Sequence, residues 1–369
     1  MTDFHTKMMR KALILARRGL GKTSPNPAVG CVIVRDGEIV GEGWHRKAGT
    51  PHAEVHALRQ AGDRARGADV YVTLEPCSHH GKTPPCAGAL INAGVLRVFA
   101  AMMDPNPIVS GRGLALLREA GIVVECGILE QECRLLNEVF IKHVTTGMPF
   151  VILKSAMTLD GKTATASGDS KWITCKESRR YVHSLRAKVD AIMVGVGTVL
   201  ADDPQLTCRM VRGKDPQRIV VDSRLRTPPS AALFHLDSQA KTILATIERD
   251  PQKIDALQAL GAEPLLCAEK EGRVDLEDML RRLGAFGIQS VLLEGGRELV
   301  GTAVRKGLVD KFLLFYAPKI IAGEDGYGLC SGSGVARMGD AFTLRNTRIR
   351  RFAEDFLVIG YPERSCLLD

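Results

Sequence analysis

Three short runs of sequence between residues 50 and 86 decide the fold of this chain: Thr-Pro-His-Ala-Glu-Val (50–55), Thr-Leu-Glu-Pro-Cys (73–77) and Pro-Pro-Cys (84–86). His52, Cys77 and Cys86 form a set of three ligands that suits zinc and leaves its fourth position for water. Glu54 lies two residues after the histidine and is well placed to carry protons to and from that water. Because bound zinc lowers the pKa of its water to about 7, this stretch predicts a catalytic zinc site.

The same residues predict how the site is held. A helix is expected to start here, with Thr50 as its cap and Pro51 in its first position. His52 and Glu54 would then lie in the first helical turn. A second helix is expected to begin at Cys86, after a pair of prolines. Helix N-termini favour the thiolate form of cysteine, which is the form that binds metals.

Simple burial is the alternative explanation for these side chains, because histidines and cysteines often lie in cores and a glutamate in a first turn can merely complement the helix dipole. His-x-Glu followed by Pro-Cys and a second cysteine matches the signature of zinc deaminases, however, and this favours the metal site. Eight residues separate Cys77 from Cys86, whereas the common signature has two. That spacing argues against an ordinary nucleoside or nucleic-acid deaminase.

Length and composition indicate a globular protein of two domains. The chain has 369 residues, of which 45% are hydrophobic and 25% charged. No apolar run approaches the ~20 residues of a membrane span, so no membrane association is expected. Phe4, Met8, Ala12 and Leu15 fall at helical spacing, which predicts an amphipathic helix rather than a signal peptide. The 10 cysteines are scattered, so we expect mostly thiols and a cytoplasmic protein.

The net charge of +8 is compatible with nucleic acid or with small anionic ligands. No block of lysine and arginine is interleaved with aromatic residues, which make up only 5% of the chain. Proteins that bind single-stranded nucleic acid stack its bases on aromatic side chains that lie among basic residues. The charge therefore favours phosphorylated small molecules over nucleic acid.

Strand and helix patterns alternate through both halves, which predicts an α/β fold in layers. The first half favours strands at 28–34, 38–43, 71–74, 97–100 and 122–124 and helices at 86–92, 114–120 and 129–143. The N-terminal amphipathic helix is expected to end at Gly19 or Gly21. Residues 145–149 are expected to be a linker. The second half favours strands at 150–154, 191–195, 218–222, 242–245, 290–294, 311–316 and 355–359 and helices at 176–188, 276–283 and 298–306.

A glycine pair in the second half follows a predicted strand and precedes a helix, in the run Glu294-Gly295-Gly296-Arg297. Backbone N–H groups at such a turn can receive a phosphate. The run is not Gly-x-Gly-x-x-Gly, so a standard dinucleotide fold is not supported. A plain tight turn is the alternative.

These runs resemble those of the bifunctional riboflavin-biosynthesis deaminase–reductases of bacteria, the RibD/RibG type, over essentially the whole chain. The matching stretches are Ser-Pro-Asn-Pro-Ala-Val-Gly (24–30), Pro-His-Ala-Glu-Val (51–55), Thr-Leu-Glu-Pro-Cys-Ser-His (73–79), Gly-Lys-Thr-Pro-Pro-Cys (81–86), Asp-Pro-Asn-Pro (104–107), Lys-Ser-Ala-Met-Thr-Leu-Asp-Gly-Lys (154–162), Gly-Val-Gly-Thr-Val-Leu-Ala-Asp-Asp-Pro (195–204) and Leu-Leu-Glu-Gly-Gly (292–296). The eight-residue spacing of the two cysteines also belongs to this family.

The resemblance implies a cytidine-deaminase-like three-layer α/β/α domain at residues 1–146 and a dihydrofolate-reductase-like α/β domain at residues 147–369. The first would use zinc to hydrolyse the 2-amino group of 2,5-diamino-6-(5-phosphoribosylamino)pyrimidin-4(3H)-one. The second would use NADPH to reduce the ribosyl group of the product, giving 5-amino-6-(5-phosphoribitylamino)uracil. A homo-oligomer, either a dimer or a tetramer, is also expected.

The family's site residues map onto this chain through the matching motifs. Glu54 is implied as the proton carrier and His52, Cys77 and Cys86 as the zinc ligands. Substrate contacts are implied for Asn26, His45, His79 and Lys82 in the first half and for Lys154, Ser170, Arg186, Leu206, Arg209 and Glu294 in the second. Contacts with NADP are implied for Ala156, Trp172, Thr174, Thr198, Asp202, Ser223 and the turn Gly296, Arg297, Glu298, Leu299, Val300, Gly301 and Thr302. A solvated loop histidine is the alternative for His79, and surface charge is the alternative for Arg186 and Arg209.

Three rival hypotheses remain open at this point. A tRNA or nucleic-acid base deaminase is opposed by the cysteine spacing and by the second half. A zinc-stabilised binding protein is opposed by Glu54 and by the count of three ligands, since structural zinc usually has four. Loss of activity in one half is compatible with the sequence.

Overall fold

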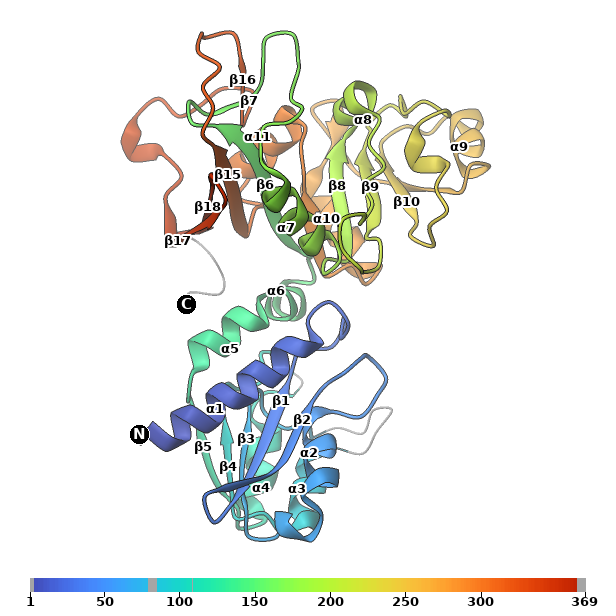
Figure 1. Ribbon diagram of the computed structural model, residues 1–369. Helices are drawn as coiled ribbons and strands as arrows, with labels where there is room; N and C mark the ends of the chain where they lie inside the picture. The colour runs from blue at the N-terminus through green and yellow to red at the C-terminus, as the bar shows by residue number, and fades with distance from the viewer. Residues whose placement is uncertain (1–2, 79–84, 108, 364–369) are drawn as a thin grey trace. The chain divides into compact units, whose positions relative to one another are not determined.

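The computed structural model of the chain describes residues 3–78, 85–107 and 109–363. It divides after Gly147 into two compact units, Met1–Gly147 and Met148–Asp369. Each unit is an α/β fold built on a sheet of its own, as Figure 1 shows. None of the described helices is long and apolar enough to cross a membrane.

The first unit has a five-stranded sheet with the order β2-β1-β3-β4-β5. Its strands are β1 (Gly30–Arg35), β2 (Glu38–Trp44), β3 (Asp69–Val72), β4 (Arg97–Ala100) and β5 (Val123–Cys126). Its α-helices are α1 (Asp3–Ala16), α2 (Ala53–Ala61), α3 (Cys86–Ala93), α4 (Arg112–Glu119), α5 (Glu130–Leu136) and α6 (Glu138–Thr146). Strand β1 runs antiparallel to both of its neighbours, whereas β3, β4 and β5 are parallel.

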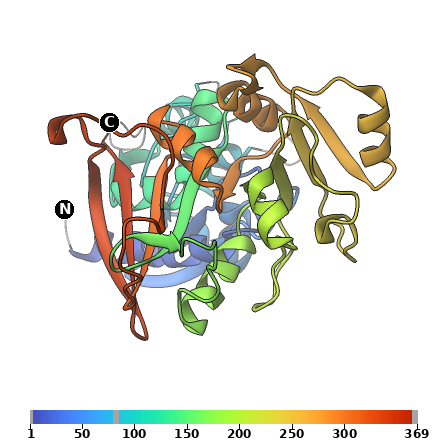
Figure 2. The same cartoon turned by 90° about the horizontal axis from the view of Figure 1, so that it is seen from above.

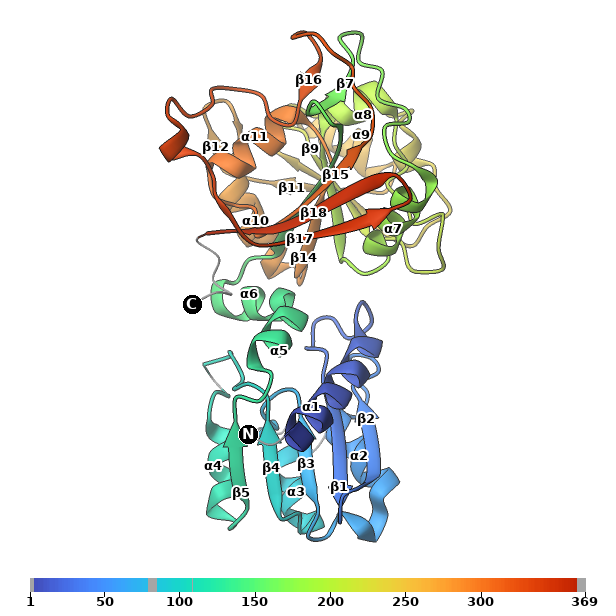
Figure 3. The ribbon, with the colours of Figure 1, turned by 60° about the vertical axis from the view of Figure 1, so that its left-hand side comes forward.

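Glycines in β1 and β2 let helices lie directly against both faces of this sheet. A Cβ at Gly30 would lie 2.0 Å from the Ala12 carbonyl oxygen of α1. A Cβ at Gly43 would lie 2.1 Å from the Ala53 carbonyl oxygen of α2. Gly43 pairs with the residue after Gly30, and neighbouring residues of a strand face opposite sides. Helices α1 and α2 therefore cover opposite faces, which gives the three predicted layers (Figure 3).

Helix α2 begins later than the sequence predicted. Ala53 is its first residue, and His52 occupies the N-cap position with an extended backbone. Thr50 does not cap the helix, because its hydroxyl instead donates to the Lys47 carbonyl oxygen in the preceding turn. His52 is consequently held at the point where the chain enters the helix.

The single helix predicted at residues 129–143 is interrupted. Helix α5 ends at Leu136 and α6 begins at Glu138, with Asn137 between them. The buried Asn137 side chain accepts a hydrogen bond from the Ala28 N–H at 2.8 Å and donates one to the Ala28 carbonyl oxygen at 3.1 Å. Asn137 and Ala28 are 109 residues apart in the sequence. The helix is interrupted where this contact forms, and helical periodicity alone does not reveal the interruption.

The second unit is built on a nine-stranded sheet with the order β11-β10-β9-β8-β14-β6-β15-β18-β17. The strands of the unit are β6 (Phe150–Thr158), β7 (Lys162–Ala164), β8 (Ala191–Gly195), β9 (Gln217–Val221), β10 (Thr242–Thr246), β11 (Ala262–Leu266), β12 (Glu269–Lys270), β13 (Arg273–Val274), β14 (Ser290–Leu293), β15 (Lys311–Ala317), β16 (Tyr327–Gly328), β17 (Leu344–Phe352) and β18 (Asp355–Pro362). Its α-helices are α7 (Lys176–Arg186), α8 (Val196–Asp202), α9 (Pro251–Gln258), α10 (Leu276–Ala285) and α11 (Arg297–Arg305).

Parallel strands from β11 to β15 form most of this sheet, and β18 and β17 extend it in antiparallel fashion. Figure 2 shows the sheet running from red β17 and β18 at one edge to gold β10 and β11 at the other. Residues of β8 alternate between two apolar cores, since Met193 packs with α10 and α11 whereas Ile192 and Val194 pack with α8 and α9. The carboxyl ends of β9, β8, β14 and β6 therefore meet at one edge, between two covered faces.

Several elements of the second unit were not predicted from the sequence. Strand β17 is exposed along almost its whole length, so it lacks the alternation of buried and exposed residues that identifies a strand. Helix α9 does have a start signal in the sequence, since Asp250 caps it and Pro251 occupies its first turn. Helix α8 follows β8 directly and is too short to show a clear periodicity.

Candidate active sites

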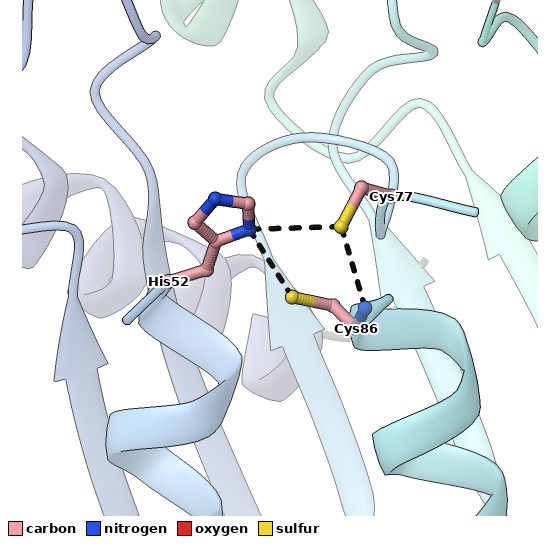
Figure 4. A group of neighbouring side chains, drawn as sticks. All are labelled: His52, Cys77 and Cys86. Carbon is pink, nitrogen blue, oxygen red and sulfur yellow. Dashed lines mark hydrogen bonds between the residues drawn. The ribbon is translucent and has the colours of Figure 1, made fainter. Parts of the chain in front are cut away.

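Three side chains of the first unit converge near the carboxyl end of β3, as Figure 4 shows. His52 occupies the N-cap position of α2, Cys77 lies in the loop that follows β3, and Cys86 is the first residue of α3. The N-terminal ends of two helices thus point at the same place. Cys86 is fully buried, whereas His52 and Cys77 are partly exposed.

The spacing of the ligand atoms fits a tetrahedral metal ion. His52 Nδ1 lies 3.3 Å from Cys86 Sγ and 3.6 Å from Cys77 Sγ, and all three ligand atoms lie within 4.8 Å of one another. Zinc–sulfur and zinc–nitrogen bonds of about 2.3 and 2.1 Å at tetrahedral angles place nitrogen about 3.6 Å from sulfur. A metal ion held by these three residues would keep one position for a further ligand.

Hydrogen bonds favour the thiolate form of Cys77, which is the form that binds a metal ion. The side-chain hydrogen bond with Cys86 lowers the pKa of the Cys77 thiol to about 4. The backbone N–H of Cys86 also donates to Cys77 Sγ at 3.3 Å. The same contact raises the pKa of Cys86, so the two sulfur atoms share a proton that a metal ion would displace.

Glu54 lies in the first turn of α2 and is 3% exposed. Its Oε2 atom has no hydrogen-bond partner within the described ranges of the chain. Burial raises the pKa of this carboxyl to about 7, so protonated and ionised forms are both populated near neutral pH. A group with such a pKa can both take and deliver a proton under physiological conditions.

Asn26 and His45 are brought together beside the metal ligands. Asn26 Nδ2 lies 3.1 Å from His45 Nε2, and the imidazole rings of His45 and His52 are 5.2 Å apart. Burial lowers the pKa of His45, which favours the neutral ring. His45 Nδ1 then donates to the Pro51 carbonyl oxygen at 3.2 Å, and Nε2 accepts from Asn26. The other two predicted contacts, His79 and Lys82, lie outside the described residues.

Glu75 is a feature of this site that the sequence analysis did not single out. The side chain is 3% exposed, and its two carboxylate oxygens accept four backbone N–H groups from the segment between Asp104 and Leu114. Glu75 lies two residues before Cys77. Its place in the run Thr-Leu-Glu-Pro-Cys was the available signal, because a carboxylate beside a metal-binding cysteine needs partners of its own.

A second cluster of charged side chains lies at the carboxyl edge of the large sheet. Arg186 at the end of α7 donates from Nε to Glu294 Oε1 at 2.8 Å and from Nη2 to Glu294 Oε2 at 2.9 Å. Lys154 of β6 places its Nζ atom 3.6 Å from Glu294 Oε2. The side chain of Glu294, which follows β14, is 6% exposed. One buried carboxylate therefore orients two cations.

The electrostatics of this cluster reflect burial opposed by ion pairing. Burial alone would raise the pKa of Glu294, but Arg186 and Lys154 outweigh it and lower that pKa to about 2. Burial lowers the pKa of Lys154, although Glu294 acts in the opposite direction. Burial together with Arg186 and Arg209 lowers the pKa of His183 to about 4, so this ring is neutral. Lys154 is thus a cation that parts with its proton more readily than a surface lysine.

Arg209 lies close to the same cluster. Its N–H donates to His183 Nδ1 at 3.1 Å, and its Nη1 atom donates to Thr207 Oγ1 at 3.2 Å. The Thr207 carbonyl oxygen in turn accepts from Arg186 at 3.0 Å, which links the two arginines. Leu206 has its side chain buried in the core beneath α8, and Ser170 is partly buried.

The glycine pair forms a turn that a larger residue would not adopt easily. Gly295 and Gly296 have φ angles of 122° and 84°, and α11 starts at the next residue. A Cβ at Gly295 would lie 3.4 Å from Thr198 Oγ1 of α8. A Cβ at Gly296 would lie 3.4 Å from the backbone nitrogen of Gly195. The ends of β8 and β14 thus bring Thr198 beside the backbone of the turn.

The remaining residues predicted to contact NADP occupy different environments. Ser223 follows β9, and its Oγ accepts from the Val274 N–H at 3.1 Å. Trp172 is 63% exposed, with the Arg179 guanidinium 4.4 Å from its ring. Further positions are Thr174, whose carbonyl accepts from Arg179; Asp202, which pairs with Lys171; Ala156, in β6 opposite Phe315; Arg297, over the Tyr327 ring; Glu298, paired with Arg273; and Thr302, in α11.

Three residues of the predicted cofactor-binding run 296–302 belong to the interior of the unit. Leu299 and Val300 lie in the apolar core, and a Cβ at Gly301 would meet the Ser331 carbonyl oxygen at 2.5 Å. Their side chains support α11 against the sheet. The groups left to face a ligand are the turn and the backbone N–H groups of the first helical turn.

Comparisons with known proteins find relatives for both halves of the chain. Residues 2–102 match the family described as cytidine and deoxycytidylate deaminase zinc-binding region, and residues 149–358 match the family described as RibD C-terminal domain. The riboflavin biosynthesis protein RibD of Actinobacillus pleuropneumoniae is 46% identical over 358 residues, which cover 97% of this chain and 95% of that protein.

Two solved structures are also similar over nearly the whole chain. Acinetobacter baumannii RibD, form 1, is 40% identical with a TM-score of 0.88, covering 97% of this chain and 99% of that one. A diaminohydroxyphosphoribosylaminopyrimidine deaminase/5-amino-6-(5-phosphoribosylamino)uracil reductase from Thermotoga maritima is 38% identical with a TM-score of 0.85, at the same coverage.

Proposed function

The chain belongs to the RibD family, and from this premise we propose how its residues divide the work of a bifunctional riboflavin-biosynthesis enzyme. The protein is a deaminase and a reductase, and it uses zinc and NADPH. We assign the hydrolytic deamination of the diaminopyrimidine to residues 1–146 and the reduction of the ribosyl group to residues 147–369. The observation that carries the deaminase assignment is the grouping of His52, Cys77 and Cys86 beside the buried carboxyl of Glu54.

In the first step, His52, Cys77 and Cys86 hold the metal ion. Zinc, when bound, supplies an acidified water molecule for attack on the ring carbon that carries the amine. Glu54 passes one proton of this water to the ring nitrogen and then the other to the leaving amine, so that the carbonyl group forms and ammonia departs. Its pKa of about 7 suits both directions of transfer.

Asn26 and the neutral ring of His45 orient the substrate beside the metal ligands. Their mutual hydrogen bond and the contact of His45 with the Pro51 carbonyl hold both side chains in place. The family resemblance supports the same role for His79 and Lys82.

In the second step, the glycine turn and the first turn of α11 receive a phosphate of the cofactor, with Thr198 beside them. NADPH, when bound, supplies the hydride for the ribosyl carbon. Arg186 and Arg209 suit the phosphate of the substrate, because guanidinium groups offer paired donors. Lys154 delivers the proton that balances the hydride, which its burial and lowered pKa support.

The test is to incubate the protein with the diaminopyrimidine ribosyl phosphate and NADPH and to follow ammonia and NADPH absorbance together. Ammonia release should come first and NADPH oxidation should lag behind it, because the reductase site is expected to prefer the deaminated product. Immediate NADPH oxidation without ammonia would reverse the proposed order, and release of neither product would refute the function.

We propose further that the protein acts in the cytoplasm as a homo-oligomer. Its described cysteines are free thiols, which is typical of a reducing compartment. Ile349 on the outer strand β17 is 71% exposed, and Phe356 on the neighbouring strand β18 is 37% exposed. Sedimentation equilibrium of the purified protein should give a dimer or a tetramer, and a monomer at micromolar concentration would contradict this.

A further inference from the structure

The buried carboxylate of Glu75 has an unusual set of partners. Its Oε2 accepts from the N–H groups of Asp104 at 3.1 Å and Gly111 at 2.9 Å, and its Oε1 accepts from those of Gly113 at 2.8 Å and Leu114 at 3.3 Å. All four donors are backbone groups, and two of them belong to the first turn of α4. Glu75 thereby joins the loop that leaves β3 to the loop that leaves β4.

The chain between Glu75 and the metal ligand Cys77 is fixed from the same side. A Cβ at Gly113 would lie 1.9 Å from the Pro76 carbonyl oxygen, so the start of α4 packs directly against the Pro76 peptide. The Glu75 N–H donates to the Met102 carbonyl oxygen at 3.0 Å. Helix α4 and the segment that follows β4 together leave little freedom for the residue before Cys77.

Helix α3 holds Cys77 from the other side. The Cys77 carbonyl oxygen accepts from the Ala87 N–H at 3.1 Å, and its Sγ accepts from the Cys86 N–H at 3.3 Å. The second metal-binding cysteine is thus fixed in its own helix, while the position of Cys77 depends on a short loop between two anchors. Glu75 is one of those anchors.

We propose that Glu75 is a positioning residue for the metal site, whose carboxylate holds the Pro76–Cys77 segment so that Cys77 Sγ meets the ion at its bonding distance. The inference rests on the zinc site described above and concerns how tightly that site binds. Outer partners of metal ligands typically change metal affinity by about 10–100-fold when they are replaced.

Glu75→Gln is the sharpest variant, because it keeps the side-chain volume and changes one acceptor oxygen into a donor. In either orientation of the amide, the NH₂ group would face two backbone N–H donors that are now bonded to oxygen. We expect zinc affinity, measured by competition with a coloured chelator, to fall at least about tenfold. With cobalt in place of zinc, the visible absorption bands should change, since they report ligand geometry.

Asp69→Asn is the matched control for a general loss of stability. Asp69 is the first residue of β3, the strand that precedes Glu75 in the chain, and its carboxylate accepts two hydrogen bonds from Arg97. This variant should lower the thermal midpoint and leave zinc affinity and the cobalt spectrum unchanged. Equal zinc affinity in Glu75→Gln and the parent would overturn the inference, and so would an equal loss in Asp69→Asn.

A measurement on the parent protein decides the matter if Glu75→Gln does not fold. Coupling between two sites is reciprocal, so zinc should in turn stabilise the contacts of Glu75. Removing zinc with a chelator should speed hydrogen exchange at residues 104 and 111–114 more than at Asp69–Val72. Identical exchange with and without zinc would overturn the inference. Failure of the parent protein to bind zinc would instead refute the metal site itself.

Discussion

The Nζ atom of Lys154 lies 3.6 Å from Oε2 of Glu294, the same oxygen that accepts a hydrogen bond from Arg186. One buried carboxylate at the carboxyl edge of the sheet is therefore the counter-ion of two cations. Arg186 is further held by the Thr207 carbonyl oxygen, whereas the structure gives Lys154 no other ion pair among the described residues. The position and the charge of Lys154 consequently depend on Glu294.

Replacing Glu294 with glutamine should damage both stability and reduction. The change leaves Arg186 buried without its counter-ion, and breaking a buried pair from one side costs about 3–5 kcal/mol. NADPH oxidation with pre-deaminated substrate should fall sharply, while ammonia release from the diamino substrate continues. Urea unfolding and the two activity assays test this. As a control, Glu277→Gln breaks an exposed pair with Arg281 and should cost less than about 1 kcal/mol.

The same carboxylate should make stability depend on acid. The pKa of Glu294 is lowered from 4.5 to about 2, so the ionised form stabilises the folded state. This contribution is complete above about pH 4.5 and is lost as the pH falls toward 2. In urea unfolding series between pH 5 and pH 2, the parent should therefore lose more stability than Glu294→Gln. Parallel curves for the two proteins would show that Glu294 titrates normally.

Replacing Glu54 with glutamine should separate proton transfer from metal binding. The amide nearly keeps the side-chain volume but cannot take the proton of the attacking water. Ammonia release should drop by at least ~10²-fold, the low end for loss of a general acid–base group. Bound zinc and the reduction of pre-deaminated substrate should stay near the parent values. Deamination at the parent rate with zinc in place would show that another group carries the proton.

Cys77→Ser provides the contrast to that variant. It removes a thiolate ligand, so both zinc and deamination should be lost, whereas reduction of pre-deaminated substrate should persist. Metal content measured on both purified variants distinguishes a missing ligand from a missing proton carrier.

Replacing Gly296 with aspartate should weaken NADPH binding and spare deamination. Gly296 has a φ of 84° at the start of α11, and the new side chain would add both strain and negative charge where a phosphate is expected. NADPH affinity, measured by fluorescence titration, should fall at least about tenfold, because one repelled charge is worth over 1 kcal/mol in a partly buried site. Gly307→Asp is the control, since Gly307 has a φ of 65° beyond the other end of α11. Equal affinity in both variants would remove this turn from the cofactor site.

Much of this architecture could be predicted because its signals are local. The hydrophobic runs at β4 and β8 match the predicted strands residue for residue, and the helix predicted at 86–92 is α3, which Gly94 ends with a φ of 66°. The pattern His-x-Glu with Pro-Cys and a second cysteine predicted a group that the structure brings within 4.8 Å.

What could not be predicted depends on contacts between distant parts of the chain. The break at Asn137 coincides with hydrogen bonds to Ala28, and the partners of Glu75 lie between 29 and 39 residues away. Helix α2 starts late because Thr50 bonds to the preceding turn instead of capping it. Strand β17 is exposed on both faces, so its pairing with β18 defines it rather than its own composition.

The carboxyl group of Glu54, buried with an oxygen that finds no partner among residues 3–78, 85–107 and 109–363, also has a consequence for evolution. Burial opposes the charge of this carboxyl and raises its pKa to about 7, which is a cost to the stability of the fold. Proteins commonly retain such weak points where reactivity requires them, and mutations that repair them are easy to find. Selection for stability alone would therefore replace Glu54 early. The resulting protein would be more stable but could no longer deaminate its substrate.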